Sequence, residues 1–277
     1  MLRHVWQTWL NVLQGVCDCM SDFFDVTLLA ILQGIAEFLP ISSSGHLVIG
    51  QHLLNVKDAG LQLDVFLHVG TLFSVGFYFR KSIWRILSEC DFRYMAMIIC
   101  SALPAVVVYA FYRENIDSLF SNAKMVGALL MFTGAVLAGT RFLPKGTKSV
   151  SFVCAFFMGV MQAIALLPGV SRSGMTLAAA RAGRVDPSKS AEFSFLMSAP
   201  LILGGMFLEI MKMLGSNSVI AQEEGVGIGL LIWGTLLSAI AGYFSLVVLV
   251  KMLKGRWFWL FGPYCIAAGL LTFCLIN

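Results

Sequence analysis

Two polar segments of an otherwise apolar chain carry the side chains best suited to acid–base, nucleophilic and anion-binding chemistry. The first is QGIAEFLPISSSGH at 33–46, and the second is QAIALLPGVSRSG at 162–174. With Gln33 aligned on Gln162, the segments read as copies that share Gln, Ser and Gly positions. They differ at three reactive positions, which are Glu37, Ser43 and His46 in the first copy and Leu166, Arg172 and Met175 in the second. One copy holds acid–base groups and the other a cation.

Glu37 is the leading candidate of the first copy because it lies within an apolar stretch. A carboxylate inside a membrane costs several kcal/mol, so such a group is a functional candidate by default. The alternative is a structural carboxylate that is hydrogen-bonded to the backbone of a broken helix. Gln33 lies one helical turn earlier and shares a face with Glu37.

Arg172 is the leading candidate of the second copy, because a guanidinium at membrane depth needs an anionic partner and its planar fork suits phosphate oxygens. The serines around it and in the first copy could serve only to break a helix. However, Ser-rich turns with free backbone N–H groups at the start of a helix also bind phosphate well. His46 follows Ser43 by three residues, so the two could act together. The combined set predicts a phosphorylated ligand at or inside the bilayer.

The amino-acid composition indicates whether these groups belong to a soluble or a membrane protein. The chain is 58% hydrophobic and 12% charged, with a mean hydropathy of +0.85, whereas a soluble domain carries about 25% charged residues. We therefore predict an all-α integral membrane protein. About six full transmembrane helices are expected near 62–79, 94–112, 123–141, 191–211, 225–250 and 257–276. The two polar segments, at about 26–54 and 150–182, are interrupted by Pro, Gly and Ser and predict two re-entrant helical hairpins.

The distribution of Lys and Arg supports these hairpins. If each hairpin leaves the membrane on the side it entered, the loops at 80–93, 141–149, 181–190 and 251–256 share the cytoplasmic side. These loops hold thirteen Lys and Arg, against four in the opposite loops, which follows the positive-inside bias. If both segments crossed the membrane instead, the split would be seven against six.

This topology divides the chain into two inverted-topology repeats, at 26–143 and 150–277, that together form one membrane domain. The hairpin tips should then meet near the bilayer midplane, where polar groups are tolerated only in protein or beside a wet cavity. Residues 1–25 form an N-terminal extension, and their apolar spacing allows an interfacial helix. The first hairpin enters from outside, which favours access to the site from the extracytoplasmic side.

The strings QGIAEFLPISSSGH and LLPGVSRSGMT, followed by AEFSFL at 191–196, resemble the undecaprenyl-diphosphatase family of bacitracin-resistance membrane proteins. The resemblance runs from about residue 20 to the C-terminus. It implies a phosphatase of the bacterial cytoplasmic membrane that converts undecaprenyl diphosphate into the monophosphate carrier of cell-wall synthesis. It also implies site roles for Gln33, Glu37, Ser42, Ser43, His46, Ser171, Arg172, Ser173, Thr176 and Glu192. Ser44, in the first Ser-rich turn, is a further candidate for binding the diphosphate.

Many members of that family have Glu where this chain has Gln33, so only Glu37 supplies a carboxylate to the first segment. The resemblance implies a divalent cation, Mg²⁺ or Ca²⁺, which would then depend on diphosphate oxygens and water. Glu37, Gln33 and Glu192 are the expected metal ligands or polar support.

Three mechanisms are open for the attack on the terminal phosphorus. The first has Ser43 as nucleophile with His46 as its base or as acid toward the leaving group. The second has His46 as nucleophile, and the third has water activated by Glu37. The related pattern SRxxxxxH of type 2 phosphatidic acid phosphatases is excluded, because Ala178 stands at its histidine position.

A transporter or flippase of polyprenyl phosphate is the alternative function, since broken helices in inverted repeats are a transporter architecture. The combination of Glu, Ser and His favours an enzyme, because transport alone needs only the cation and the turns. A structural membrane protein is a weaker alternative that leaves Arg172 and Glu37 without a reason. The expected partners are a polyprenyl diphosphate lipid and the bilayer, with no nucleic acid. The oligomeric state is left open, with a homodimer as one alternative.

Overall fold

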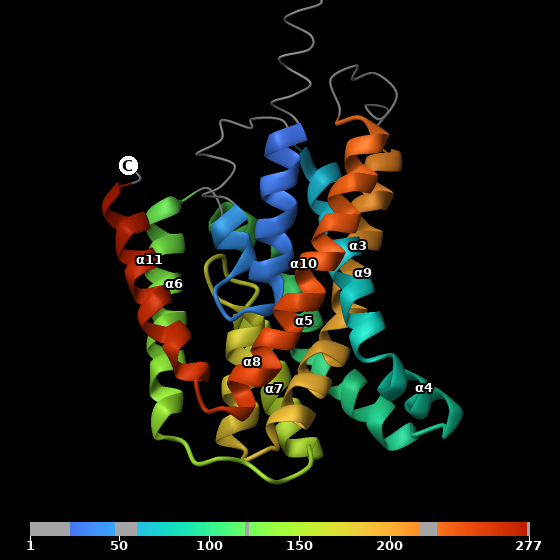
Figure 1. Cartoon of the computed structure of the whole chain (residues 1–277), viewed down its shortest axis with the longest axis vertical. Helices are drawn as coiled ribbons and strands as arrows, with labels where there is room; N and C mark the ends of the chain where they lie inside the picture. The colour runs from blue at the N-terminus through green and yellow to red at the C-terminus, as the bar shows by residue number, and fades with distance from the viewer. Residues whose placement is uncertain (1–22, 48–59, 120–121, 216–225, 276–277) are drawn as a thin grey trace, which may run out of the picture.

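The computed structural model describes residues 23–47, 60–119, 122–215 and 226–275 (Figure 1). Within these ranges the regular structure is helical, apart from an isolated bridge between Lys148 and Val185. The chain begins with a helix at 23–38 and a helical turn at 43–47. The following helices are α3 (Gly60–Tyr78), α4 (Arg80–Ser88), α5 (Phe92–Leu119), α6 (Ala123–Gly139), α7 (Phe152–Ile164), α8 (Arg172–Ala182), α9 (Pro187–Gly215), α10 (Ile228–Lys254) and α11 (Phe261–Leu275). Short 3₁₀ turns η1 (Thr140–Phe142) and η3 (Phe258–Leu260) follow α6 and precede α11.

Each of the six predicted spans corresponds to a helix, which confirms the all-α membrane architecture. In the described part of the chain, four helices are long and apolar enough to cross a bilayer, within α5, α6, α9 and α10. The other two spans are less regular. α3 contains Asp64 and His68, and α11 has only 15 residues, with η3 directly before it.

The long helices pack in pairs through small residues. α3 lies against α10, α6 against α11 and α5 against α7. A Cβ atom on Gly134 of α6 would lie 2.7 Å from the carbonyl oxygen of Gly262 on α11, and one on Gly127 would lie 2.8 Å from that of Gly269. Such close backbone approach supplies the van der Waals contact that holds helices together in lipid, where burial alone gives no preference for a protein partner.

Both broken segments turn back in the interior. The helix at 23–38 and α7 enter from opposite ends of the molecule, and their tips meet in the middle (Figure 1). At the meeting point, the hydroxyl of Ser173 donates to the carbonyl of Leu39 at 3.3 Å, and Phe38 packs edge-on against Phe195 of α9. The remainder of the first hairpin and most of the N-terminal extension, including its proposed interfacial helix, lie outside the described residues.

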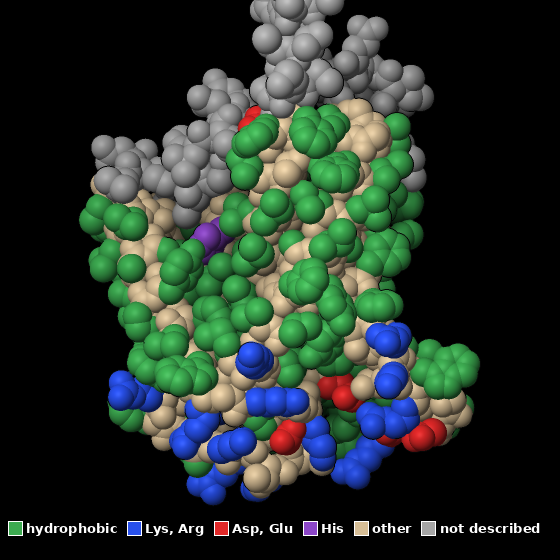
Figure 2. Space-filling view, viewed as in Figure 1, with side chains coloured by type: hydrophobic (Ala, Val, Ile, Leu, Met, Phe, Trp, Pro, Cys, Tyr) green, Lys and Arg blue, Asp and Glu red, His purple; other side chains and the backbone are tan. Residues whose placement is uncertain are grey.

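The four basic loops lie together at one end of the molecule, as the charge count predicts. Figure 2 shows the Lys and Arg side chains gathered there, below a broad apolar band. Two of the loops also contact each other, since the backbone of Lys148 donates to the carbonyl of Arg184 at 3.0 Å. Arg141 lies over the ring of Trp259 in η3, which follows the last basic loop. The first of these loops contains α4, an amphipathic helix that the sequence analysis missed, with Trp84 74% exposed.

Candidate active site

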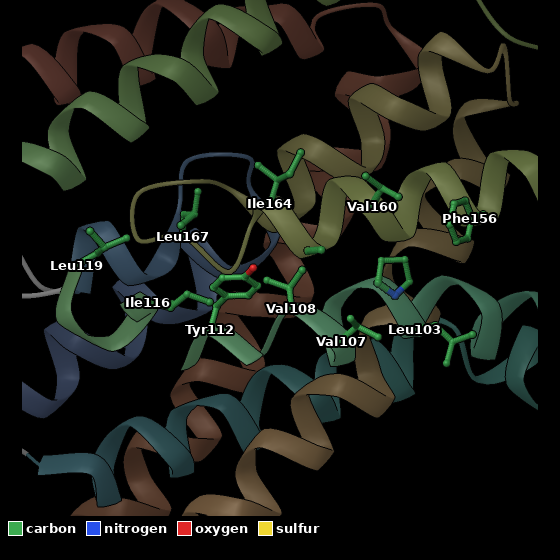
Figure 3. A pocket seen from close by; sticks show the side chains of 12 residues that line it. Leu103, Val107, Val108, Tyr112, Ile116, Leu119, Phe156, Val160, Ile164 and Leu167 are labelled. Carbon is green, nitrogen blue, oxygen red and sulfur yellow. The ribbon is translucent and has the colours of Figure 1, made fainter. Parts of the chain in front are cut away.

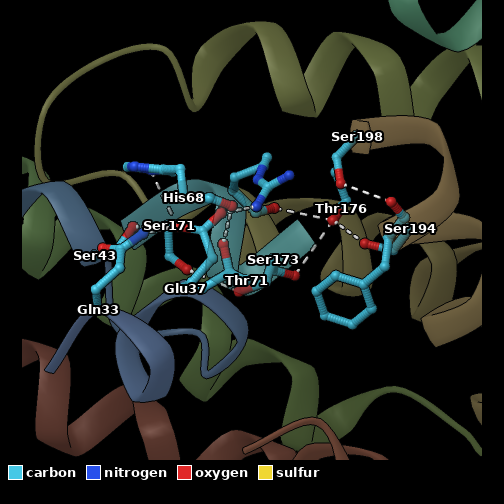
Figure 4. Close-up of polar contacts among 12 residues, drawn as sticks. Gln33, Glu37, Ser43, His68, Thr71, Ser171, Ser173, Thr176, Ser194 and Ser198 are labelled. Carbon is cyan, nitrogen blue, oxygen red and sulfur yellow. Dashed lines mark hydrogen bonds and ion pairs between the residues drawn. The ribbon is translucent and has the colours of Figure 1, made fainter. Parts of the chain in front are cut away.

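Glu37 is the centre of the polar cluster between the hairpin tips (Figure 4). It lies at the end of the helix at 23–38 and is only 7% exposed. Its Oε1 atom accepts a hydrogen bond from Nη2 of Arg172. Its Oε2 atom accepts from the hydroxyl of Ser43 at 2.8 Å and from Nε2 of Gln33 at 3.2 Å. A charged acceptor with three donors is the form in which a membrane interior tolerates a carboxylate.

The backbone of the first tip directs Ser43 toward Glu37. Ser42 has a φ of +69°, a left-handed conformation that costs a residue with a side chain about 1–2 kcal/mol. This residue reverses the chain, so that a helical turn starts at Ser43 and its hydroxyl faces back to the carboxylate. The Ser42 hydroxyl in turn accepts from the backbone N–H of Gly45 at 3.4 Å.

The second tip repeats this local bonding. The Ser171 hydroxyl caps α8 by accepting from the backbone N–H of Gly174 at 3.1 Å, and it lies 3.3 Å from the Ser173 hydroxyl. In the first tip, the hydroxyls of Ser42 and Ser44 are 3.4 Å apart. Thr133 of α6 ties the second tip down, because its hydroxyl donates to the carbonyl of Gly169 and accepts from the backbone N–H of Ser171, both at 3.2 Å.

Arg172 is the first residue of α8, and this position carries its guanidinium across the tips to Glu37. Its Nη1 atom is buried and has no hydrogen-bond partner among the described residues. A buried donor without a partner costs about 1–3 kcal/mol, and more on a charged group. The guanidinium therefore retains capacity for a further acceptor, as a phosphate-binding arginine requires.

These groups surround a cavity of about 190 Å³. Its walls are formed by both tips, by α3 and by α9, and the polar side chains among them are Glu37, Ser42, Ser43, Ser44, His68, Ser171 and Arg172. The structure thus brings together most of the side chains that the two polar segments nominated. The cavity combines one cation, one carboxylate and several hydroxyls in a small space, which suits the binding of an anionic group.

His68 of α3 belongs to this cluster, although the sequence analysis did not single it out. Its Nδ1 atom lies 2.8 Å from the carbonyl oxygen of Asp64, and its Nε2 atom lies 3.7 Å from Oε2 of Glu37. Because a carbonyl can only accept, Nδ1 carries the proton in neutral His68, and the lone pair of Nε2 points to the cavity. The available signal was a histidine within an apolar span, by the same argument that selected Glu37.

Both ring nitrogens of His46 lie beside groups other than the Ser43 hydroxyl, whereas our preferred mechanism pairs His46 with Ser43. Its Nδ1 atom is 2.9 Å from the carbonyl of Ser42, and its Nε2 atom is 2.8 Å from the hydroxyl of Tyr264 on α11. The two rings are stacked at 5.7 Å. The hydroxyl of Ser43 is bonded to Glu37 instead, so the carboxylate occupies the position expected for the base.

Two other predicted residues lie away from the cavity. The Thr176 hydroxyl is 2.6 Å from that of Ser194 on α9 and donates to the carbonyl of Arg172 at 2.9 Å, which supports α8 from behind. Glu192 pairs with Arg85 at 3.1 Å and accepts from Ser82 at 2.9 Å, so it fastens α4 to α9. Glu37 and Glu192 therefore do not form one site.

A divalent cation would find few protein ligands near Glu37. In the described ranges, no three His, Cys, Asp or Glu side chains converge, and Glu37 is the only carboxylate that lines the cavity. The Oε1 atom of Gln33, however, is buried and has no hydrogen-bond partner there. One carboxylate and one amide oxygen suit Mg²⁺ or Ca²⁺ when a substrate supplies further oxygens.

Comparisons with known proteins agree with the resemblance of the two polar segments. The family model for bacitracin resistance protein BacA matches residues 26–271. The chain is 35% identical to the undecaprenyl-diphosphatase of Desulforapulum autotrophicum, with 91% of this chain and 97% of that protein covered. It is 34% identical to the undecaprenyl-diphosphatase of Halothermothrix orenii, with 92% and 99% covered. It is 33% identical to undecaprenyl-diphosphatase 4 of Bacillus cereus, with 92% and 97% covered.

Proposed function

The chain belongs to the bacitracin resistance protein BacA family and is a membrane enzyme that hydrolyses undecaprenyl diphosphate, and we propose that it does so in the cavity between the hairpin tips. The products are undecaprenyl phosphate and inorganic phosphate, which return the lipid carrier to cell-wall synthesis and account for bacitracin resistance. Nothing in the comparisons favours the alternative of a polyprenyl phosphate flippase, since the relatives are named as diphosphatases.

The observation that carries the choice of site is Arg172, whose side chain lines the cavity and whose Nη1 atom has no hydrogen-bond partner among the described residues. A diphosphate in the cavity would accept from this atom and from the hydroxyls of the two tips. Its negative charge would also compete with Glu37 for the guanidinium. Substrate binding would thereby weaken the ion pair and free the Glu37 carboxylate to accept the proton of Ser43.

The geometry favours Ser43 as nucleophile and Glu37 as its base. The Ser43 oxygen forms a bond to the terminal phosphorus while the bond from phosphorus to the bridging oxygen breaks, and undecaprenyl phosphate leaves. The Ser43 proton passes to Oε2 of Glu37, which already accepts it at 2.8 Å. Water then displaces the phosphate from Ser43, and the serine regains its proton. This assignment replaces His46 with Glu37 in our preferred mechanism.

A bound Mg²⁺ or Ca²⁺ would neutralise charge on the diphosphate oxygens. Glu37 and Gln33 are the residues that would hold it, and the diphosphate and water would supply the other ligands. We expect a chelator such as EDTA to reduce phosphate release by the wild-type protein, and added Mg²⁺ or Ca²⁺ to restore it. Full activity after chelation would contradict this part of the proposal.

The same proposal places the enzyme in the bacterial cytoplasmic membrane, with the basic loops in the cytoplasm and the cavity reached from the extracytoplasmic side. Two observations support inverted repeats at 26–143 and 150–277. The serines of the two tips make matching hydrogen bonds. In addition, α3 of the first half packs on α10 of the second, and α9 of the second half packs on α5 of the first. These contacts are equivalent if α3 corresponds to α9 and α5 corresponds to α10.

Phosphate release from undecaprenyl diphosphate by detergent-solubilised protein tests the proposed function. The wild type should release phosphate, and Arg172→Ala should lose about 10³-fold in kcat/KM, as expected when a preorganised charge at a transferring phosphoryl group is removed. Arg181→Ala is the matched control, since Arg181 lies on α8 outside the cavity. A wild-type protein that releases no phosphate would contradict the activity, and an active Arg172→Ala variant would contradict the site.

A further inference from the structure

A second, larger hollow lies between α5 and α7 (Figure 3). It has a volume of about 650 Å³, and its walls are apolar side chains, with the phenol of Tyr112 as an exception. Val107 and Tyr112 stand on the α5 side, and Phe156 and Val160 stand on the α7 side. Phe156 is 50% exposed and Tyr112 is 59% exposed, so the groove opens toward the surrounding lipid.

The groove forms where two helices first touch and then leave space between their side chains. A Cβ atom on Gly159 of α7 would lie 2.2 Å from the carbonyl oxygen of Ser101 on α5, so the backbones are in contact there. Beyond this contact, Pro104 interrupts the hydrogen bonding of α5 and itself lines the groove. The result is a groove built into the protein surface.

The second hairpin tip lies between the groove and the polar cavity, with residues of the same tip in both walls. Leu167 lines the groove, whereas Val170 lines the cavity, and the two belong to a single turn closed by the hydrogen bond from the Val170 N–H to the Leu167 carbonyl at 3.1 Å. Ile164 and Ala165 are likewise neighbours in the chain, with Ile164 in the groove and Ala165 in the cavity wall. A molecule with a polar head and an apolar tail could occupy both at once.

We propose that the groove between α5 and α7 binds the first isoprene units of the polyprenyl chain while the diphosphate occupies the cavity. This inference rests on the proposed function, because it assigns the tail of the same substrate. The groove walls offer hydrocarbon contacts, as an isoprenoid requires, and only the single turn at Leu167–Val170 separates them from the head group site.

The groove contributes by packing against the isoprenoid tail and by orienting the diphosphate. The lipid acyl chains are as apolar as the groove, so transferring the tail from the bilayer gives little hydrophobic free energy. Close contact with fixed side chains does give dispersion energy. It also holds the terminal phosphorus in line with its nucleophile, an effect that contributes to kcat as well as to KM.

Filling the groove with a large side chain tests this assignment. Val160→Trp on α7 and Val107→Trp on α5 should each lower kcat/KM for undecaprenyl diphosphate about fivefold, which corresponds to about 1 kcal/mol. The control is Val153→Trp, which adds the same side chain to α7 at a position that is 82% exposed and outside the groove. The control variant should keep the wild-type value.

Labelling with a photoreactive polyprenyl diphosphate gives a readout that does not depend on turnover. We expect crosslinks within 103–119 and 156–167, and undecaprenyl diphosphate should compete them away. Crosslinks elsewhere, or crosslinks that phospholipid alone removes, would overturn the inference, as would groove variants with unchanged kcat/KM. If the wild type binds the probe in the groove but releases no phosphate, the proposed function fails and the tail site stands.

Discussion

Glu37 receives hydrogen bonds from two donors in its own hairpin and from one in the other half of the chain. Gln33 lies on the same helix, Ser43 follows the first turn, and Arg172 begins α8 in the other half of the protein. His68 adds a fourth polar group at 3.7 Å. The chemistry at this residue therefore depends on both halves, and no single segment contains a complete site.

The choice of nucleophile can be decided at Ser43. In a reaction with terminally radiolabelled undecaprenyl diphosphate, rapid quenching in acid should trap phosphoserine at this position, and a parallel alkaline quench preserves any acid-labile phosphohistidine. Ser43→Ala should give no labelled peptide and no turnover. Glu37→Gln should lower kcat by about 10²–10⁴-fold, the range expected for loss of a general base. Phosphohistidine at His46 would restore that residue as nucleophile, and turnover without any phosphoenzyme would favour direct attack by water.

His68 provides a second prediction at the residue scale. His68→Gln should lower kcat for undecaprenyl diphosphate by about 10-fold or more, because His68 is, besides Glu37, the one acid–base group that the described residues contribute to the cavity wall. Gln62→Ala serves as the control and should have no effect, because Gln62 is exposed near the start of the same helix, α3. Equal activity of both variants would show that His68 does not take part.

At the scale of elements, the hairpin tips are defined by backbone features that Ser and Gly permit. Gly169 has a φ of +90°, and a Cβ atom at that position would lie 2.4 Å from the carbonyl of Val126 on α6. The second tip is thus pressed against α6 and held by Thr133. Both tips need support from other helices, because a bent backbone in a membrane must have its polar groups satisfied by protein or by water.

Thr133→Val tests that support. The substitution keeps the shape of the side chain but leaves the Gly169 carbonyl and the Ser171 N–H without this partner. We expect a loss of about 1–3 kcal/mol in unfolding free energy and a lower kcat, because Arg172 follows Ser171 directly. Thr272→Val on α11 is the control, since the Thr272 hydroxyl is also buried and, within the described part of the chain, donates to Ala268 of its own helix rather than to another element. Equal thermal stability of the two variants would contradict this role of Thr133.

At the scale of the whole molecule, basic and apolar side chains occupy different zones along the long axis (Figure 2). The basic residues cluster at one end and the apolar band covers the middle (Figure 2). α4 lies at the basic end with exposed Trp84 and Leu87, as is typical of a helix at a membrane surface. The ion pair between Arg85 and Glu192 attaches α4 to α9, so Glu192 has a structural role outside the cavity.

Sidedness can be measured in intact cells. In a cysteine-free background, Lys254→Cys should be protected from a membrane-impermeant maleimide, and Lys124→Cys should react, because the two exposed residues lie at opposite ends of the spans. The pattern should invert in inside-out vesicles. Labelling of both positions from the same side would contradict the hairpin topology and with it the inverted repeats.

The sequence by itself determined the solvent, the helices and most of the cavity. Apolar runs long enough to span a bilayer have little choice but to be helical, since the backbone must satisfy its own hydrogen bonds there. A charged side chain inside a membrane costs free energy, so Glu37 and Arg172 could be identified as candidate site residues. These are local properties of composition and solvation, so they can be derived without a fold. The short helix α4 was not predicted, because its nine residues form no long apolar run.

The tertiary structure decided which groups meet. Sequence spacing placed His46 beside Ser43, but the reversal at Ser42 turns Ser43 toward Glu37, while His46 reaches Tyr264 of α11. Similarly, His68 lines the cavity from α3, whereas Glu192 lies ten residues before Ile202, the α9 residue in the cavity wall, and pairs with Arg85 instead. Side-chain direction depends on a few backbone angles and on packing between distant helices, and neither is encoded in the spacing of residues along the chain.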